Sequence, residues 1–140
     1  MKRSASAVWK GGLQDGRGTV STESGLLSNT PYNFRMRFEN EHGTNPEELV
    51  AAAHAACFSM ALSAILGRAG LVAESINTKA TVTLEKVGEG FAVTASHLDT
   101  TVSIPGADKA AFTQAVEAAK TGCPISKLLN APITMDAKLL

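Results

Sequence analysis

One apolar segment, residues 44–62, constrains the fold of this chain more than any other. It reads TNPEELVAAAHAACFSMAL, and no further glycine or proline occurs before Gly67. At its start, a threonine and an asparagine can cap a helix, the proline suits a first turn because it has no N–H group to lose, and two glutamates suit the positive end of the helix dipole. The sequence therefore predicts a helix that continues to about Ala69.

This helix is apolar on almost every side, which is typical of a helix buried in a protein core. Its length, its many alanines and its interruptions at Glu47, Glu48, His54 and Ser59 argue against a membrane span. One sheet covers only one side of such a helix. We therefore expect a homodimer in which a second subunit covers the other side through an extensive apolar interface.

Length, charge and cysteine content limit the classes of function. The 140 residues are enough for one domain with a real core but not for two, so residues 1–140 are expected to form a single domain. Thirteen basic residues balance 13 acidic ones, which argues against a nucleic acid or a membrane surface as a partner. No secretory signal opens the chain, so we expect a cytoplasmic location, where two cysteines are more often thiols or a redox pair than a structural disulfide. Neither the cysteines nor the three histidines match a zinc spacing.

Alternating polar and apolar residues predict three strands before the long helix. Residues 4–13 and 18–24 form a hairpin on this interpretation, with a glycine-rich turn between them. Residues 34–38 read FRMRF, which predicts a third strand with one apolar face. Arg35 and Arg37 would then share the opposite face of that strand.

The pattern after the helix predicts two strands, two helices and a last strand. Residues 76–87 and 91–104 are expected to pair as a second hairpin across a Gly-Glu-Gly turn. Asp108 can cap a helix, which Gly122-Cys123-Pro124 ends, and Pro124 begins a short helix through residue 129. Residues 132–138 form the final strand. The predicted fold is α+β, with mostly antiparallel sheets packed on a long buried central helix.

The two cysteines are the first candidates for chemistry, and each has a purely structural alternative. Cys123 precedes a short helix, whose positive end would lower the pKa of its thiol, but a small buried residue in a corner between helices is the more common case. Cys57 lies within the long helix, where burial would raise its pKa and leave it inert unless a cation stabilises the thiolate. His54 can share a face with Cys57 and suggests thiol catalysis, although a core histidine with one backbone partner is the more common case.

The arginines of residues 34–38 offer a cation for such a thiolate. A guanidinium group is always charged, and it can pair with a carboxylate, here Glu47 or Glu48, while it faces a thiolate. Ten residues of straight helix separate Glu47 from Cys57 by about 15 Å, so these two side chains cannot touch. An arginine has to bridge the gap, the helix has to bend, or a second subunit has to supply one of the groups.

Four motifs give the chain a resemblance to a known family. They are GTNPEELVAAAHAACFSMAL at residues 43–62, GCPISKLL at residues 122–129, GTVSTESG at residues 18–25 and the P-Y-x-F-x-x-R-F pattern at residues 31–38. With these motifs the chain resembles the OsmC/Ohr family of thiol-dependent peroxidases over nearly its whole length. It is similar to the OsmC branch more than to the Ohr branch.

The resemblance implies an intertwined homodimer of α+β subunits with two active sites at the subunit interface. Cys57 matches the peroxidatic cysteine of the family and Cys123 the resolving cysteine. Arg37 matches the arginine that holds the thiolate in the OsmC branch, and Glu47 matches the glutamate that orients it. The Ohr branch takes its arginine from a loop in the first hairpin, so Arg17 is the alternative to Arg37. The resemblance assigns no catalytic role to the histidine near Cys57.

The activity implied by the resemblance is the reduction of organic hydroperoxides to alcohols in oxidative or osmotic stress defence. Cys57 would form a sulfenic acid, Cys123 would condense with it to an intrasubunit disulfide, and an external dithiol or lipoyl protein would reduce that disulfide. No metal, flavin or haem is required. Two alternatives stay open at this point: a thiol redox sensor, and a non-redox small-molecule binding module with two inert cysteines.

Overall fold

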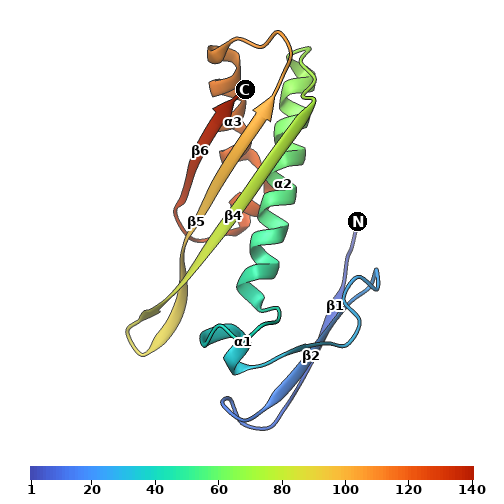
Figure 1. The fold of residues 1–140 in the computed structure, drawn as a ribbon, viewed down its shortest axis with the longest axis vertical. Helices are drawn as coiled ribbons and strands as arrows, with labels where there is room; N and C mark the ends of the chain where they lie inside the picture. The colour runs from blue at the N-terminus through green and yellow to red at the C-terminus, as the bar shows by residue number, and fades with distance from the viewer. The chain divides into compact units, whose positions relative to one another are not determined.

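The computed structural model describes residues 1–140 and divides into two compact units, Met1–Leu49 and Val50–Leu140. Figure 1 shows the course of the chain through both. The helix α2 (Pro46–Arg68) begins in the first unit and contributes most of its length to the second.

The first unit contains a small antiparallel sheet in the order β1 (Ala5–Lys10), β2 (Arg17–Thr22) and β3 (Thr30–Tyr32). The predicted hairpin of the first two strands is confirmed. Gly18 on the central strand pairs with Trp9 on one side and with Tyr32 on the other, and the two aromatic rings lie 5.5 Å apart. A Cβ atom at Gly18 would lie 2.6 Å from the Tyr32 ring and 2.8 Å from the Trp9 ring, so only glycine lets these rings meet across the strand.

The predicted third strand over residues 34–38 is wrong, because these residues form the helix α1 (Phe34–Phe38). The side chain of Asn33 caps the helix by accepting a hydrogen bond from the Met36 N–H at 2.8 Å. Phe34, Met36 and Phe38 are two residues apart, as on one face of a strand, but Phe34 and Phe38 are also four apart, as on one face of a helix. The pattern of five residues therefore fits both structures, and the cap from Asn33 favours the helix. Arg35 and Arg37 therefore do not share a face, since two residues of helix turn by about 200°.

Helix α2 begins as the sequence predicts, and Asn45 is its cap. The Glu48 N–H donates to Asn45 Oδ1 at 2.9 Å, while Asn45 Nδ2 donates to the carbonyl of Met36 at 3.3 Å and so links α1 to the start of α2. Thr44 donates instead to the Glu48 carboxylate at 2.8 Å. The length and composition of α2 do not argue against a membrane span as expected, because its 23 residues are long and apolar enough to cross a membrane. Core helices of soluble proteins meet the same criteria.

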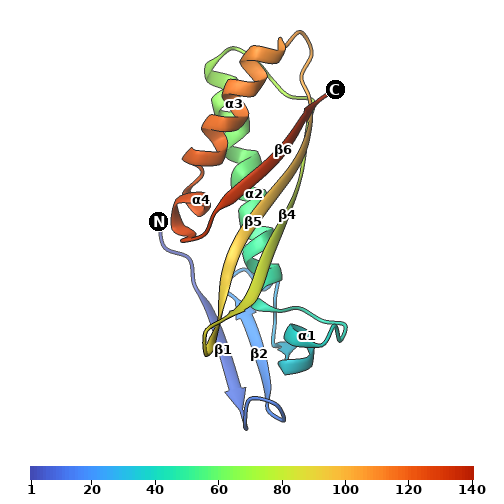
Figure 2. The same ribbon diagram turned by 90° about the vertical axis from the view of Figure 1, so that its left-hand side faces the viewer.

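The second unit is a three-stranded sheet covered on one face by helices (Figures 1 and 2). Its strand order is β4-β5-β6; β4 pairs with β5 antiparallel as predicted, and β5 pairs with β6 parallel. The parallel pair follows from the helical connection, because a chain that returns through helices can enter a strand from the same end. The elements are β4 (Ser75–Val87), β5 (Gly90–Ser103), α3 (Lys109–Gly122), α4 (Pro124–Leu128) and β6 (Ile133–Leu139).

The core of this unit lies between the sheet and the helices α2 and α3. Asp108 caps α3 as predicted, with its carboxylate accepting from the Ala111 N–H at 2.7 Å. The four apolar residues at helical spacing in α3 are all buried: Phe112, Ala115, Val116 and Ala119. They meet buried side chains of α2 and β5: Phe58, Leu62, Leu66, Leu98 and Val102.

Within one chain, α2 is buried along only one stripe. His54, Phe58, Leu62 and Leu66 are four residues apart and fully buried. The face that includes Ala52, Ala56, Met60 and Ala64 is exposed. A single chain therefore does not cover α2 on every side, because the sheet and helix α3 pack against one side only. The predicted α+β class is confirmed, and a second subunit on the exposed face stays a prediction.

Candidate active site

The structure brings the two cysteines together in the second unit. Cys57 lies midway along α2, and Cys123 lies at the junction where α3 ends and α4 begins. Their sulfur atoms are 2.8 Å apart, with the Cys123 thiol donating to Cys57 Sγ, and both are free thiols. Cys123 is fully buried and Cys57 is half-buried. Sixty-six residues separate the cysteines in sequence, so only the packing of α4 against α2 makes them neighbours.

The surroundings of Cys57 disfavour its thiolate. Burial raises the pKa of the Cys57 thiol above its ordinary value, and the hydrogen bond and charge of Cys123 raise it further. The backbone N–H of Ile125, in the first turn of α4, acts in the opposite direction on this pKa but does not outweigh burial. The pair within the second unit is therefore close enough to react but needs a cation to hold Cys57 as a thiolate at neutral pH.

The first unit holds a candidate for that cation. Arg37 on α1 forms a forked ion pair with Glu47 in the first turn of α2, where Nη2 donates to Oε1 at 2.7 Å and Nε donates to both carboxylate oxygens at 3.2 Å. The guanidinium carbon also lies 5.2 Å from the centroid of the Phe38 ring. The Glu47 side chain is only 13% exposed and that of Arg37 36%. These bonds use Nε and Nη2, so Nη1 is the nitrogen left to face a second anion.

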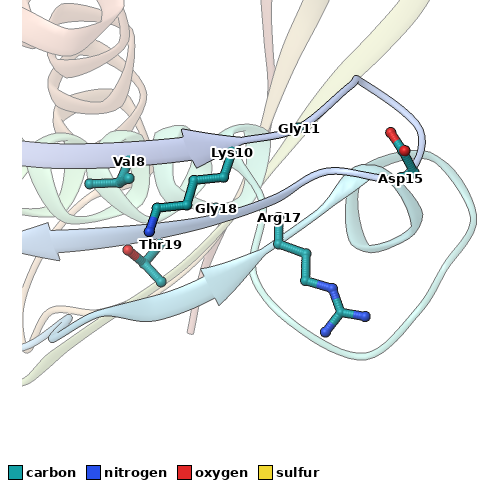
Figure 3. A pocket seen from close by; sticks show the side chains of 7 residues that line it. All are labelled: Val8, Lys10, Gly11, Asp15, Arg17, Gly18 and Thr19. Atoms are coloured by element: carbon teal, nitrogen blue, oxygen red, sulfur yellow. The ribbon is translucent and has the colours of Figure 1, made fainter.

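The two other arginines considered have different surroundings. Arg35, across the helix from Arg37, pairs with Glu39 at 3.5 Å and Glu41 at 3.2 Å, and its side chain is 67% exposed. Arg17 lies at the start of β2, beside the turn of the first hairpin, and extends away from Lys10 and Asp15 (Figure 3). It forms no ion pair, so no carboxylate fixes its orientation as Glu47 fixes that of Arg37.

An aromatic pocket of about 270 Å³ lies beside Arg37 in the first unit. Its position follows from the sheet and α1, because the Trp9–Tyr32 contact across Gly18 forms one wall and the ring pair Phe34–Phe38, 4.7 Å apart, lies on the helix. A charged group at the edge of an apolar pocket suits a ligand with a polar head and an apolar tail. The full lining is Trp9, Leu13, Tyr32, Asn33, Phe34, Arg37, Phe38 and Pro46.

His54 is the residue whose surroundings the sequence analysis did not anticipate. The expected backbone partner is wrong, since both ring nitrogens meet serine hydroxyls: Nδ1 lies 2.7 Å from Ser96 Oγ and Nε2 lies 2.8 Å from Ser126 Oγ. All three residues are buried, and burial lowers the pKa of the His54 imidazole. Ser96 and Ser126 are distant in sequence and carry no recognisable motif, so no signal in the sequence could have identified them.

The predicted site residues thus form two groups. Cys57 and Cys123 meet in the second unit, and Arg37 and Glu47 meet in the first. No group of three or more His, Cys, Asp or Glu side chains has the arrangement of a metal site. The catalytic roles of these four residues stay predictions.

Comparison with known proteins identifies the family. The profile of the family described as OsmC-like protein matches residues 38–138. The chain belongs to the OsmC-like family. It is 55% identical over 133 residues to peroxiredoxin OsmC of Escherichia coli, which covers 95% of this chain and 93% of that protein.

More distant relatives belong to the other branch. The organic hydroperoxide resistance protein of Xanthomonas axonopodis pv. citri is 28% identical, over 91% of this chain and 88% of that protein. The crystal structure of the organic hydroperoxide resistance protein OhrB of Bacillus subtilis matches with a TM-score of 0.68 and 25% identity, and covers 98% of each chain. The prediction that this OsmC-like chain lies closer to the OsmC branch is confirmed by these identities.

Proposed function

We propose that this OsmC-like protein is a cysteine-based peroxidase that reduces organic hydroperoxides to alcohols. The observation that carries the proposal is the contact between Cys57 and Cys123, whose sulfur atoms lie 2.8 Å apart as free thiols. Two inert cysteines would not require their sulfur atoms to be in contact, whereas a peroxidatic cysteine requires a resolving thiol close enough to form a disulfide with it. The names of the relatives, a peroxiredoxin and an organic hydroperoxide resistance protein, support the same activity.

The reaction proceeds in two steps at these sulfur atoms. The Cys57 thiolate attacks the terminal oxygen of the hydroperoxide, the O–O bond breaks, and the alkoxide leaves as an alcohol after protonation, so that Cys57 becomes a sulfenic acid. Cys123 then attacks the Cys57 sulfur, the S–O bond breaks, and the departing hydroxide takes up the proton of the Cys123 thiol to form water. The product is an intrasubunit disulfide, which an external dithiol reduces by thiol–disulfide exchange. A small dithiol or a lipoyl protein is the proposed source of these two thiols.

Arg37 supplies the positive charge that the first step requires. The raised pKa of Cys57 means that its own surroundings do not maintain a thiolate, and a guanidinium group near the sulfur would lower that pKa. Glu47 restricts Arg37 to one orientation through three hydrogen bonds. We propose that these two pairs form one site in the assembled protein, with Nη1 of Arg37 directed at the thiolate and the peroxide oxygen.

The assembled protein is proposed to be a homodimer. Residues on the face of α2 opposite the buried stripe are exposed in a single chain, although they are alanine and methionine. A second subunit would bury this face, and the same assembly would place two active sites at the interface. The expectation of a cytoplasmic setting, without a nucleic-acid or membrane partner, stays a prediction.

The preferred substrates are hydroperoxides with apolar tails. The aromatic pocket beside Arg37 offers apolar walls to an alkyl or aryl group while the guanidinium group meets the peroxide. Hydrogen peroxide has no tail to fill this pocket and is expected to react more slowly.

The deciding experiment measures the consumption of cumene hydroperoxide by the purified protein with dithiothreitol, in the wild type and in the variants Cys57→Ser and Cys123→Ser. We expect turnover in the wild type, none with Cys57→Ser, and a single oxidation of Cys57 that dimedone traps as a sulfenic acid with Cys123→Ser. Oxidation to the disulfide with negligible turnover would favour a redox sensor. Two thiols that do not react with the peroxide would overturn the proposal and favour a non-redox binding module.

A further inference from the structure

His54 and Ser126 make a contact that runs beside the contact of the two cysteines. His54 lies three residues before Cys57 on α2, and Ser126 lies three residues after Cys123 on α4. Nε2 of His54 is 2.8 Å from Ser126 Oγ, and Cys57 Sγ is 2.8 Å from Cys123 Sγ. Because residues three apart on a helix share a face, α2 and α4 are joined by two neighbouring contacts, of which only the sulfur contact takes part in the reaction.

The other ring nitrogen of His54, Nδ1, also has a partner, and this contact restricts the orientation of the imidazole ring. Nδ1 lies 2.7 Å from Ser96 Oγ on β5, and all three side chains are buried. A neutral imidazole has one N–H donor and one acceptor nitrogen, so one serine accepts a hydrogen bond from the ring and the other donates to it. Both ring nitrogens are satisfied in this neutral state, and burial favours it by lowering the pKa of His54. The ring therefore has one orientation, defined by the sheet.

Helix α4 is short, and its other contacts with the rest of the unit are few: Ile125 packs partly buried against the core, and the N–H of Cys123 donates to the Ala119 carbonyl at the end of α3. The helix has only five residues, and no side chain caps its N-terminus, because its cap residue is Cys123 itself. A short segment of this kind is marginally stable alone and depends on tertiary contacts. Ser126 is the buried residue within α4, so its bond to His54 is placed to control where the helix, and hence Cys123, lies.

We infer that His54 is a positioning residue for the resolving step: through Ser126 it holds α4 so that Cys123 stays within bonding distance of Cys57. This inference rests on the proposed peroxidase function, which it extends by a residue that never touches the peroxide. The consequence is specific to one step. Loss of the contact should slow the attack of Cys123 on the Cys57 sulfenic acid much more than it changes the first oxidation of Cys57, because Cys123 and the Ile125 N–H act in opposite directions on the pKa of Cys57.

The test compares the two steps in the full-length protein. The variant Ser126→Ala removes one hydroxyl and creates almost no cavity, and His54→Gln replaces the ring with a side chain that still offers a donor and an acceptor. A stopped-flow reaction with cumene hydroperoxide gives the rate of Cys57 oxidation, and quenching with dimedone gives the lifetime of the sulfenic acid. We expect a resolving step slower on the order of tenfold, since one buried hydrogen bond is lost, and a smaller change in the rate of Cys57 oxidation. Ser126→Thr, which keeps the hydroxyl, should restore the rate.

Ser59→Ala is the matched control on α2. Its hydroxyl oxygen lies 2.9 Å from the Ala55 carbonyl oxygen and 2.9 Å from Thr78 Oγ1, and it forms no hydrogen bond with α4 or the cysteines, so resolution should keep the wild-type rate. A resolving step as fast in Ser126→Ala and His54→Gln as in the wild type would overturn the inference while the peroxidase function stands.

A second measurement needs no peroxide and keeps the two proposals separable. The equilibrium between the Cys57–Cys123 disulfide and glutathione gives the effective concentration of one thiol at the other. We expect this concentration to fall on the order of tenfold in Ser126→Ala but not in Ser59→Ala. If the effective concentration falls in Ser126→Ala but the wild type has no peroxidase activity, the proposed function is refuted and the positioning role of His54 is not. An unchanged effective concentration would refute the positioning role of His54.

Discussion

Replacement of Arg37 by alanine tests the electrostatic argument most directly. Burial raises the pKa of Cys57, so its thiolate fraction at neutral pH is small unless a cation opposes the effect. An opposite charge within 4–6 Å lowers a pKa by about 1–3 units. Since the thiolate fraction changes about tenfold for each unit while the pKa lies above the pH, Arg37→Ala should slow oxidation of Cys57 by about 10- to 1,000-fold at neutral pH.

The pH dependence distinguishes this cause from a general loss of structure. A thiolate forms as the pH rises, so in Arg37→Ala the oxidation rate should be low at neutral pH and should increase toward the wild-type rate in alkaline solution. The assay is the second-order rate constant for cumene hydroperoxide as a function of pH, measured in a Cys123→Ser background so that only the first step is observed. Part of the loss will persist at high pH if the guanidinium group also orients the peroxide.

Two matched controls are available in the same unit. Arg35→Ala removes a guanidinium group from the other side of α1, where it pairs with Glu39 and Glu41, and should leave the profile unchanged. Arg17→Ala tests the alternative arginine of the first hairpin. An unaltered pH profile in Arg37→Ala would refute the reasoning, and a shift in Arg17→Ala alone would assign the thiolate to that residue.

Two further predictions concern stability and assembly. Leu62→Ala removes a fully buried side chain between α2 and the sheet and should lower the free energy of unfolding by about 2–5 kcal/mol. Urea titration measures this change. The control Val72→Ala, at an 81% exposed site, should change the free energy of unfolding by less than about 0.5 kcal/mol. An equal effect of both substitutions would contradict the burial of Leu62 in the core. Met60 is 76% exposed on the apolar face of α2, so the wild type should sediment as a dimer and Met60→Arg should shift it toward the monomer. A monomeric wild type would exclude the proposed interface.

Sequence patterns are most reliable here where local chemistry decides the structure. Asp108 caps α3 and Asn45 caps α2 as their side chains allow, and β4 alternates because one of its faces packs on the helices. The pattern misled at residues 34–38, where five residues fit either period and only the cap from Asn33 selects the helix. That error also placed Arg35 beside Arg37 on one face, whereas the helix separates them.

The sequence by itself determined the family, the long helix with Cys57 inside it, and the identity of the four candidate catalytic residues. Only the tertiary structure decided that the sulfur atoms of Cys57 and Cys123 touch, and that the ion pair of Arg37 with Glu47 is forked. The serine partners of His54 likewise could not be predicted, since they come from β5 and α4. The physical reason is one of range: caps and periodicity act within a few residues, whereas a reactive site depends on contacts between segments far apart in the chain, which only packing of the core defines.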